Sequence, residues 1–167
     1  AVILQNQSLQ PVTDPGAMLT HGRRLCDAAD DIGARKILYL TWAYATPHGT
    51  MTNLPHGVDP ALLPVMQDRL DAAYGQLAYD AAADIAPVGP AFALARQFLP
   101  GLRLHTADNS HPTAAGSYLA GLVLYATIFN DAPTGATNVF LIPARGTDNA
   151  DGVRSVTIEP AQAAALG

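Results

Sequence analysis

Short apolar runs alternate along the chain with longer segments in which apolar residues recur at helical spacing. Three of these runs are rich enough in apolar residues to form strands buried on both faces. The expected strands lie at 2–5, 36–43 and 85–88. The helical pattern predicts helices at 17–32, 60–83, 91–98, 112–129 and 159–166, and 139–142 is a candidate edge strand.

Turn and capping residues mark several ends of these elements. Gly33 closes the first helix, and Asp59 followed by Pro60 is a favourable helix N-terminus. Pro64 falls within about the first turn of that helix, where a proline is tolerated. The segment 44–58 holds prolines, glycines and two histidines, and we expect it to be a long loop.

The order strand, helix, strand, helix, strand, helix, helix predicts an α/β fold, with a parallel sheet and helices on both of its faces. With 167 residues, the chain is long enough for one domain with its own core and short for two. Three strands are few, because sheets usually have about five or six. We therefore expect the chain to be the later part of a fold.

Composition and charge argue against several classes of function. The net charge is −5 and the nine Lys and Arg residues are scattered, so we expect no nucleic-acid-binding surface and no basic membrane surface. No apolar run is long enough to span a bilayer. Cys26 is the single cysteine, which excludes an internal disulfide and a cysteine-based zinc site, and its place in a helix predicts a buried thiol. The Ala- and Pro-rich composition is compatible with a secreted or periplasmic bacterial protein but assigns no compartment.

Three of the histidines give no sign of chemistry. His48 and His56 lie in the expected loop, with no acidic or third histidine ligand at metal-binding spacing. His21 follows Thr20 on a helix and is expected at the surface. We therefore expect no metal and no other cofactor.

The loop before the last long helix holds a carboxylate and an imidazole three residues apart, Asp108 and His111. Active-site residues of open parallel sheets lie on such loops, beyond the carboxyl ends of the strands. At this spacing Asp108 can accept a hydrogen bond from Nδ1–H of His111, which leaves Nε2 to take a proton from a hydroxyl. The positive N-terminal end of the following helix favours the aspartate anion. The alternative is that Asp108 only caps a turn and His111 is an unreactive loop residue, because a bare D-x-x-H occurs often by chance.

The residues around this pair resemble those of a known family. The pattern D-x-x-H-P-T-x-x-G-S-Y-L-A, which begins at Asp108, is similar to the last sequence block of the SGNH (GDSL-like) hydrolases. LQNQS at 4–8 resembles the third block of the branch in which a Q-x-x-S-type loop replaces G-x-N-D. LYLTWAY at 38–44 and APVGPAFALAR at 86–96 resemble the same branch, so the likeness covers roughly residues 2–130.

This resemblance implies a flavodoxin-like three-layer α/β/α fold with a parallel sheet, the SGNH-hydrolase fold, lacking its first strand or strands. It assigns residues 1–133 to the C-terminal portion of such a domain and residues 134–167 to a C-terminal extension packed on it. It also implies a serine-type ester hydrolase without a cofactor, acting on a small-molecule or carbohydrate ester. In such an enzyme Asp108 and His111 belong to a Ser-His-Asp triad.

The resemblance further gives the LQNQS loop the role of supplying an oxyanion-hole side chain. Gln7 is the first candidate donor and Gln5 the second, and Ser8 is expected to hold the loop in shape. For both glutamines the alternative is a structural hydrogen bond to the neighbouring loop. Trp42, at the end of the second strand, is a candidate wall for the substrate, and packing in the core is the alternative.

No serine of this sequence stands where the family's nucleophile is expected. The G-D-S block is absent, and the serines are at positions 8, 110, 117 and 155. None is set in a sharp strand-to-helix turn, the usual place of an activated serine. We therefore expect the nucleophile on an upstream segment, and an N-terminal segment or a second chain to complete the sheet.

Two alternatives of other functional classes stay open. One is a non-catalytic remnant or pseudoenzyme of the same fold that binds a ligand or a partner, and the missing nucleophile favours it. The other is a structural or interaction domain with no site, against which the ordered run of matched segments speaks.

Overall fold

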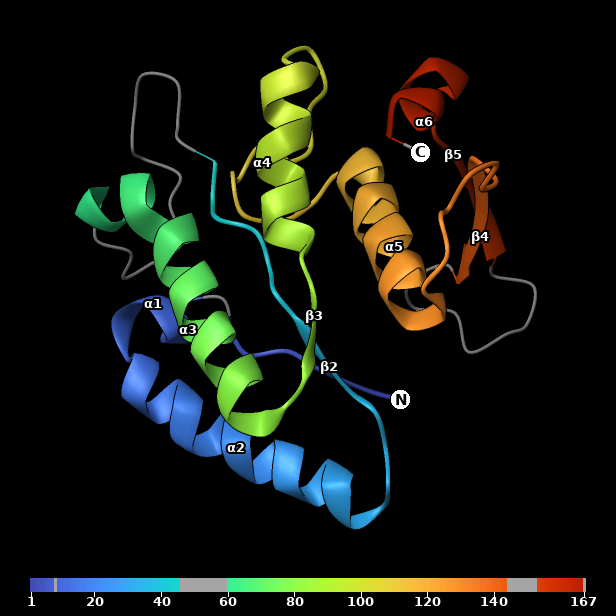
Figure 1. The fold of residues 1–167 in the computed structure, drawn as a ribbon. Helices are drawn as coiled ribbons and strands as arrows, with labels where there is room; N and C mark the ends of the chain where they lie inside the picture. Colours follow the sequence, from blue (N-terminus) through green and yellow to red (C-terminus); the bar gives the residue numbers. More distant parts are fainter. Residues whose placement is uncertain (8, 46–59, 144–152, 167) are drawn as a thin grey trace.

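The expected strands form a three-stranded parallel sheet in the computed structural model, which describes residues 1–7, 9–45, 60–143 and 153–166 (Figure 1). They are β1 (Val2–Leu4), β2 (Lys36–Tyr39) and β3 (Asp84–Ala86), paired in that order. Ile3 of β1 lies opposite Ile37 of β2, and Leu38 of β2 lies opposite Ile85 of β3. The chain therefore has the α/β fold that the order of its elements predicted.

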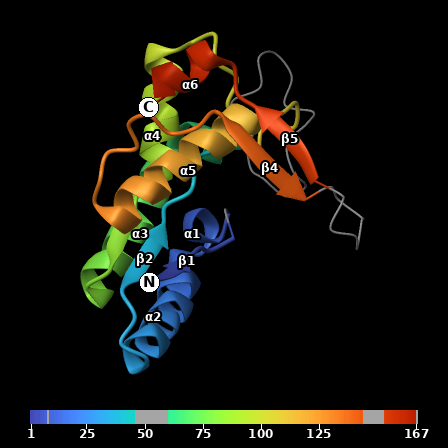
Figure 2. The same ribbon diagram turned by 90° about the vertical axis from the view of Figure 1, so that its right-hand side faces the viewer.

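Helices cover both faces of this sheet. The remaining elements are α1 (Gln10–Thr13), α2 (Pro15–Asp31), the 3₁₀ helix η2 (Pro60–Val65), α3 (Met66–Ala81), α4 (Val88–Phe98), α5 (Ala114–Phe129), β4 (Val139–Pro143), β5 (Val153–Thr157) and α6 (Pro160–Leu166). α2 and α3 pack on one face of the sheet with α1 beside them, and α4 and α5 pack on the other (Figures 1 and 2). The result is the expected three-layer α/β/α arrangement.

Large apolar side chains fill the layer between the sheet and α2 and α3. Leu38 of β2 is buried there with Met18 of α2 and with Leu70, Tyr74 and Leu77 of α3. Each fully buried side chain of this size contributes about 1.5–3 kcal/mol relative to an exposed one. This cluster holds the sheet against α2 and α3.

A second cluster lies between the sheet and α4 and α5. Phe92 of α4, Leu119 of α5 and Leu104 from the connecting segment are buried together, and Trp42 packs against them. α5 approaches the connecting segment closely at Gly116, where a Cβ would lie 2.4 Å from the Leu104 carbonyl oxygen. The cluster thereby fixes the start of α5, and the loop before it, next to the end of β2.

Pro64 divides the helix expected at 60–83. Residues 60–65 form the 3₁₀ helix η2, and α3 begins only at Met66. The prediction of one helix running through Pro64 was wrong, because a proline lacks the N–H that an α-helix interior needs and its ring crowds the preceding turn. The expected cap at Asp59 and most of the expected loop at 44–58 lie outside the described residues.

β2 ends at Tyr39, well before residue 43, where the expected strand ended. The Leu40 N–H still donates to the Ala86 carbonyl of β3 at 3.1 Å, and the next backbone groups find partners outside the sheet. The Leu40 carbonyl accepts a hydrogen bond from the Gly89 N–H at 2.9 Å, and the Ala43 N–H donates to Oε1 of Gln67 at 2.9 Å. The apolar run predicted a longer strand because these partners, on α4 and α3, are distant in the sequence.

Other boundaries moved for local reasons. The strand expected at 85–88 is shorter, and the helix expected at 91–98 begins at Val88. Pro90 lies in the first turn of this helix, where backbone N–H groups have no partner within the helix, so its missing N–H costs no helical hydrogen bond. α1 and β5 were not expected. β5 pairs antiparallel with β4, which the pattern did predict as an edge strand.

The C-terminal residues pack on α5. Ile158, which precedes α6, and Ala163 of α6 are buried against Tyr118 and Leu122 of α5. The ribbon of β4 and β5 lies beside α5, apart from the parallel sheet (Figure 2). On the opposite side of the molecule, Cys26 of α2 is buried as expected, and burial raises the pKa of its thiol.

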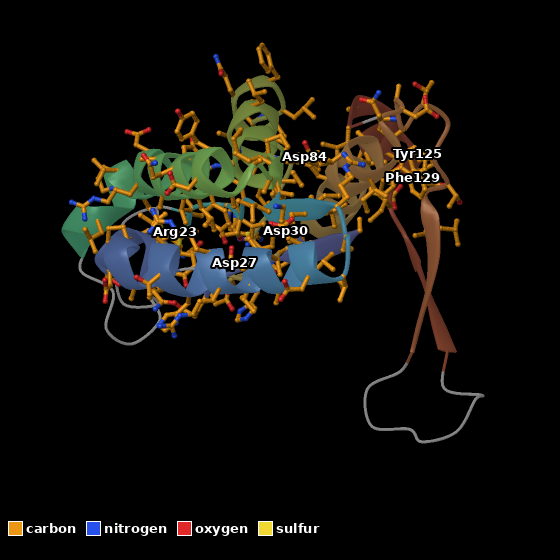
Figure 3. The ribbon with its side chains drawn as sticks, turned by 60° about the horizontal axis from the view of Figure 1, so that its bottom comes forward. Arg23, Asp27, Asp30, Asp84, Tyr125 and Phe129 are labelled. Atoms are coloured by element: carbon orange, nitrogen blue, oxygen red, sulfur yellow. The ribbon has the colours of Figure 1, made fainter. Side chains whose placement is uncertain are left out.

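Within the described residues, β1 is an edge strand, paired only with β2. Ile3 is 44% exposed, although its register partner Ile37 is fully buried. Tyr125 and Phe129 are also exposed, with ring centroids 4.9 Å apart at the end of α5, and the N-terminus lies near that end (Figures 1 and 3). Apolar surface therefore lies at this edge of the sheet.

No helix in the described part of the chain is long and apolar enough to cross a membrane.

Candidate active site

Asp108 and His111 lie on one loop between α4 and α5, beside the segment that leaves the carboxyl end of β2. The base of the loop is closed by an antiparallel bridge between His105 and Pro112. Oδ2 of Asp108 lies 2.5 Å from Nδ1 of His111. The structure thus brings together the two side chains that the sequence singled out.

Hydrogen bonds from the loop itself hold the Asp108 carboxylate. Oδ1 accepts from the Ser110 N–H at 2.9 Å, from the His111 N–H at 2.9 Å and from the Thr106 hydroxyl at 2.7 Å. The Ser110 N–H first, and then the His111 side chain, hold the pKa of the Asp108 carboxyl well below its usual range. Asp108 is therefore an anion with both oxygens engaged.

An ionised carboxylate beside Nδ1 determines which nitrogen of His111 carries the proton. A carboxylate only accepts hydrogen bonds, so Nδ1 donates to it and Nε2 is left as the basic nitrogen. The His111 side chain is 77% exposed, and no described residue forms a hydrogen bond with Nε2. The ring is held through one nitrogen and accessible at the other.

Trp42 contacts both the core and this loop. Its Nε1–H donates to the Ser110 carbonyl at 2.9 Å. Its ring stacks on Phe92, with centroids 4.6 Å apart and an interplanar angle of 8°. The core packing that was the alternative for Trp42 is present, and the hydrogen bond to the loop accompanies it.

The LQNQS loop follows β1. Oε1 of Gln7 accepts from the N–H groups of Leu9 and Gln10, at 2.9 and 3.1 Å, and so supports the start of α1. This is a structural hydrogen bond of the kind that was the alternative for Gln7. Gln5 is exposed, and Ser8 lies outside the described residues. No hydrogen bond between described residues joins either glutamine to the loop of Asp108 and His111.

No hydrogen bond joins the side chain of Ser110 or Ser117 to Nε2 of His111. Ser110 lies between the two members of the pair, and its own N–H is bound to Asp108. Ser117, on α5, lines a cavity of about 460 Å³ to which neither Asp108 nor His111 contributes. Ser155 belongs to β5, in the C-terminal ribbon.

His105 and Thr106 support the site, although the sequence pattern singled out neither of them. His105 is buried, its Nε2–H donates to the Ala43 carbonyl at 3.1 Å, and burial lowers the pKa of its imidazole. Thr106 donates its hydroxyl proton to Asp108. Both belong to the stretch HTADNSHP, and a threonine two residues before the acid was the available signal for Thr106.

No group of His, Cys, Asp and Glu side chains among the described residues is arranged to hold a metal ion. His48 and His56 lie outside that part of the chain. His21 is exposed on α2, as expected.

Among solved structures, the chain is similar to a protein from Slackia heliotrinireducens described as a "putative SGNH hydrolase". The two share 32% sequence identity with a TM-score of 0.63, over 76% of this chain and 64% of that protein. The chain thus spans less than two thirds of the length of this relative. No protein-family model and no curated protein matches the chain.

Proposed function

Because this chain has the fold of the SGNH hydrolases, as its motifs indicated, we propose that it carries the histidine and the aspartate of a serine-type ester hydrolase. The observation that carries the proposal is the 2.5 Å contact between Oδ2 of Asp108 and Nδ1 of His111, with Nε2 accessible. In this role His111 is the general base and acid, and Asp108 orients its ring and stabilises its charged form.

The reaction follows from this tautomer. Nε2 of His111 takes the proton of a serine hydroxyl while the serine oxygen attacks the ester carbonyl carbon. The imidazolium then gives that proton to the leaving alcohol, and the acyl group stays on the serine. A water molecule, deprotonated by the same nitrogen, releases the acid and restores the serine. The depressed pKa of Asp108 supports this cycle, because the carboxylate stays ionised while the ring gains its charge.

The serine comes, in this proposal, from outside the described residues, on an N-terminal segment or a second chain that completes the sheet. One edge of β1 is paired with no described strand, and this supports the proposal, because a further parallel strand paired there ends on the same side as the loop of His111. The relative's greater length is consistent with it. Ser110 is a poor candidate, because the carboxylate that orients the imidazole also binds its N–H.

The oxyanion requires N–H donors at the same edge of the sheet. Gln7 remains the first candidate, since its Oε1 is engaged at the start of α1 and its Nε2 is the atom left to donate. Gln5 is the second candidate. The proposed substrate is a small-molecule or carbohydrate ester, which rests on the family resemblance alone, and the mechanism uses no cofactor.

The role of His111 is tested in the full natural polypeptide with a p-nitrophenyl ester as substrate. His111→Ala removes the base, and we predict that kcat falls by about 10³-fold or more. His21→Ala, at an exposed histidine of α2, is the control and is expected to keep the parent rate.

Equal rates for His111→Ala and the parent would remove His111 from the mechanism. A parent polypeptide that hydrolyses no ester would favour the second candidate function, a non-catalytic ligand- or partner-binding module of the same fold. The observation in its favour is that no described hydroxyl is bonded to Nε2 of His111.

A further inference from the structure

The segment that leaves β2, residues 40–45, runs along the loop of Asp108 and His111 and is bonded to it repeatedly. Three hydrogen bonds join them: Trp42 Nε1–H to the Ser110 carbonyl at 2.9 Å, the Ala45 N–H to the Asn109 carbonyl at 2.8 Å, and His105 Nε2–H to the Ala43 carbonyl at 3.1 Å. The first two bonds are accepted by Ser110 and Asn109, which lie between Asp108 and His111 in the sequence. The loop is therefore attached to this segment at the positions that set the geometry of the pair.

The other side of the segment is attached to α3 and α4. Oε1 of Gln67 accepts from the Ala43 N–H at 2.9 Å, and Sδ of Met66 accepts from the Tyr44 N–H at 3.4 Å. Gly89 of α4 lies so close that a Cβ there would stand 2.3 Å from the Thr41 carbonyl oxygen. The segment is thus fixed to two helices, and it can hold the loop rather than move with it.

Trp42 acts on the peptide unit between Ser110 and His111. The carbonyl of that unit accepts from Nε1–H of Trp42, and its N–H donates to Oδ1 of Asp108 at 2.9 Å. A peptide group bonded at both ends has a fixed orientation, and each bond strengthens the other. The N–H of this peptide unit is that of His111. The orientation of the unit therefore sets the position of the His111 backbone, from which the imidazole side chain extends.

The indole itself has little freedom. It stacks on Phe92 at 4.6 Å and meets Tyr39 edge to face at 6.4 Å. Phe92 in turn contacts the ring of His105, with centroids 5.6 Å apart. The aromatic side chains thereby hold Nε1 where it meets the Ser110 carbonyl.

We infer that Trp42 is a positioning residue of the proposed hydrolase: its indole N–H holds the Ser110–His111 peptide unit and, through it, the Asp108–His111 pair. The inference rests on the proposed function and gives Trp42 a different role from a substrate wall. The hydrogen bond from Trp42 stabilises the transition state, in which the position of Nε2 of His111 matters, and does not change the affinity for the substrate.

The variant Trp42→Phe tests this, because it keeps a ring against Phe92 and removes the N–H. In the full natural polypeptide we expect kcat for a p-nitrophenyl ester to fall about 10- to 100-fold with KM unchanged. Tyr79→Phe, at an exposed tyrosine of α3, is the control and is expected to keep both constants.

Other results for Trp42→Phe and His111→Ala would overturn either the inference or the proposed function. A raised KM with unchanged kcat assigns Trp42 to a substrate wall and overturns the inference. An unchanged kcat for Trp42→Phe, beside an inactive His111→Ala, also overturns it while the proposed function stands. An active His111→Ala defeats the proposed function itself.

A second measurement does not depend on activity. Trp42 is the single tryptophan of the 167 residues, so its indole N–H gives one ¹H–¹⁵N resonance. We expect its hydrogen exchange in this chain to be at least about 10-fold slower than in free tryptophan, and Asp108→Ala to remove most of that protection because it releases the loop. Exchange as fast as in free tryptophan contradicts the inference even if Trp42→Phe does not fold.

Discussion

Asp108 organises the site at the scale of single residues. Its two oxygens accept four hydrogen bonds, from Thr106, from the Ser110 and His111 backbone and from the His111 ring. Three of these bonds shape the loop and one orients the imidazole. A substitution at this position therefore affects both the stability of the loop and the tautomer of His111.

The stability effect has a defined dependence on pH. The folded-state pKa of Asp108 is depressed, so its stabilising contribution is fully present above the unfolded pKa of about 4 and is lost as the pH falls through the folded pKa. We predict that Asp108→Asn lowers the free energy of unfolding relative to the parent, by a larger amount at about pH 6 than at about pH 3. Urea unfolding at the two pH values measures the difference.

Asp68→Asn, at an exposed carboxyl of α3, controls for the loss of a negative charge, and its effect is expected to be smaller. A penalty for Asp108→Asn that is the same at both pH values would contradict the depressed pKa and the hydrogen bonds assigned to this carboxylate.

The sequence predicted part of this residue-scale picture because part of it is local. Asp108 and His111 are three residues apart, so their spacing alone gives the contact. Trp42 is separated from Ser110 by 68 residues, and Ala43 from His105 by 62, so neither contact has a sequence pattern. Those contacts depend on how β2, α4 and α5 pack.

At the scale of elements, patterning predicted the strands and long helices but not where they stop. The three strands and the helices α2, α3, α4 and α5 follow from apolar runs and helical spacing. The end of β2 depends on Gln67, a side chain of α3, and the start of α3 depends on Pro64. Of the antiparallel pair, β4 was predicted from its strand pattern. β5 was not predicted, because it is defined mainly by its pairing with β4.

Arg35 links elements that are distant in the sequence. It stands just before β2, and its Nε donates to Asp84 of β3 at 2.7 Å. Its two terminal nitrogens donate to the carbonyls of Thr127 and Ile128, each at 2.8 Å, at the end of α5. A cation here satisfies carbonyls that a helix C-terminus leaves unpaired and complements the helix dipole.

We predict that Arg35→Ala destabilises the protein by about 1–2 kcal/mol, because it removes charged hydrogen bonds at a partly exposed site. For a chain of this size that is a fall in Tm of about 2–8 °C. Thermal unfolding followed by circular dichroism measures it, with Arg24→Ala, at an exposed arginine of α2, as the control. Equal effects of the two substitutions would mean that the link between β2, β3 and α5 contributes nothing measurable.

At the scale of the whole molecule, the proposed site is made of segments that meet where the strands end. The loop after β1, the segment after β2 and the loop before α5 come to the same side, as expected for a parallel sheet with helices on both faces. The described residues place the Asp108 carboxylate and the His111 imidazole there. They also leave one edge of β1 unpaired, with Ile3 of β1 44% exposed, and such an edge pairs readily with another strand.

The central claim is that Asp108 and His111 act on a hydroxyl supplied from outside residues 1–167. The most direct test is the intact mass after treatment with a fluorophosphonate, which bonds covalently to an activated serine. We predict one added probe on the full natural polypeptide, at a serine outside residues 1–167, and none on its His111→Ala variant or on residues 1–167 alone. A probe attached to a serine within residues 1–167 would contradict the account.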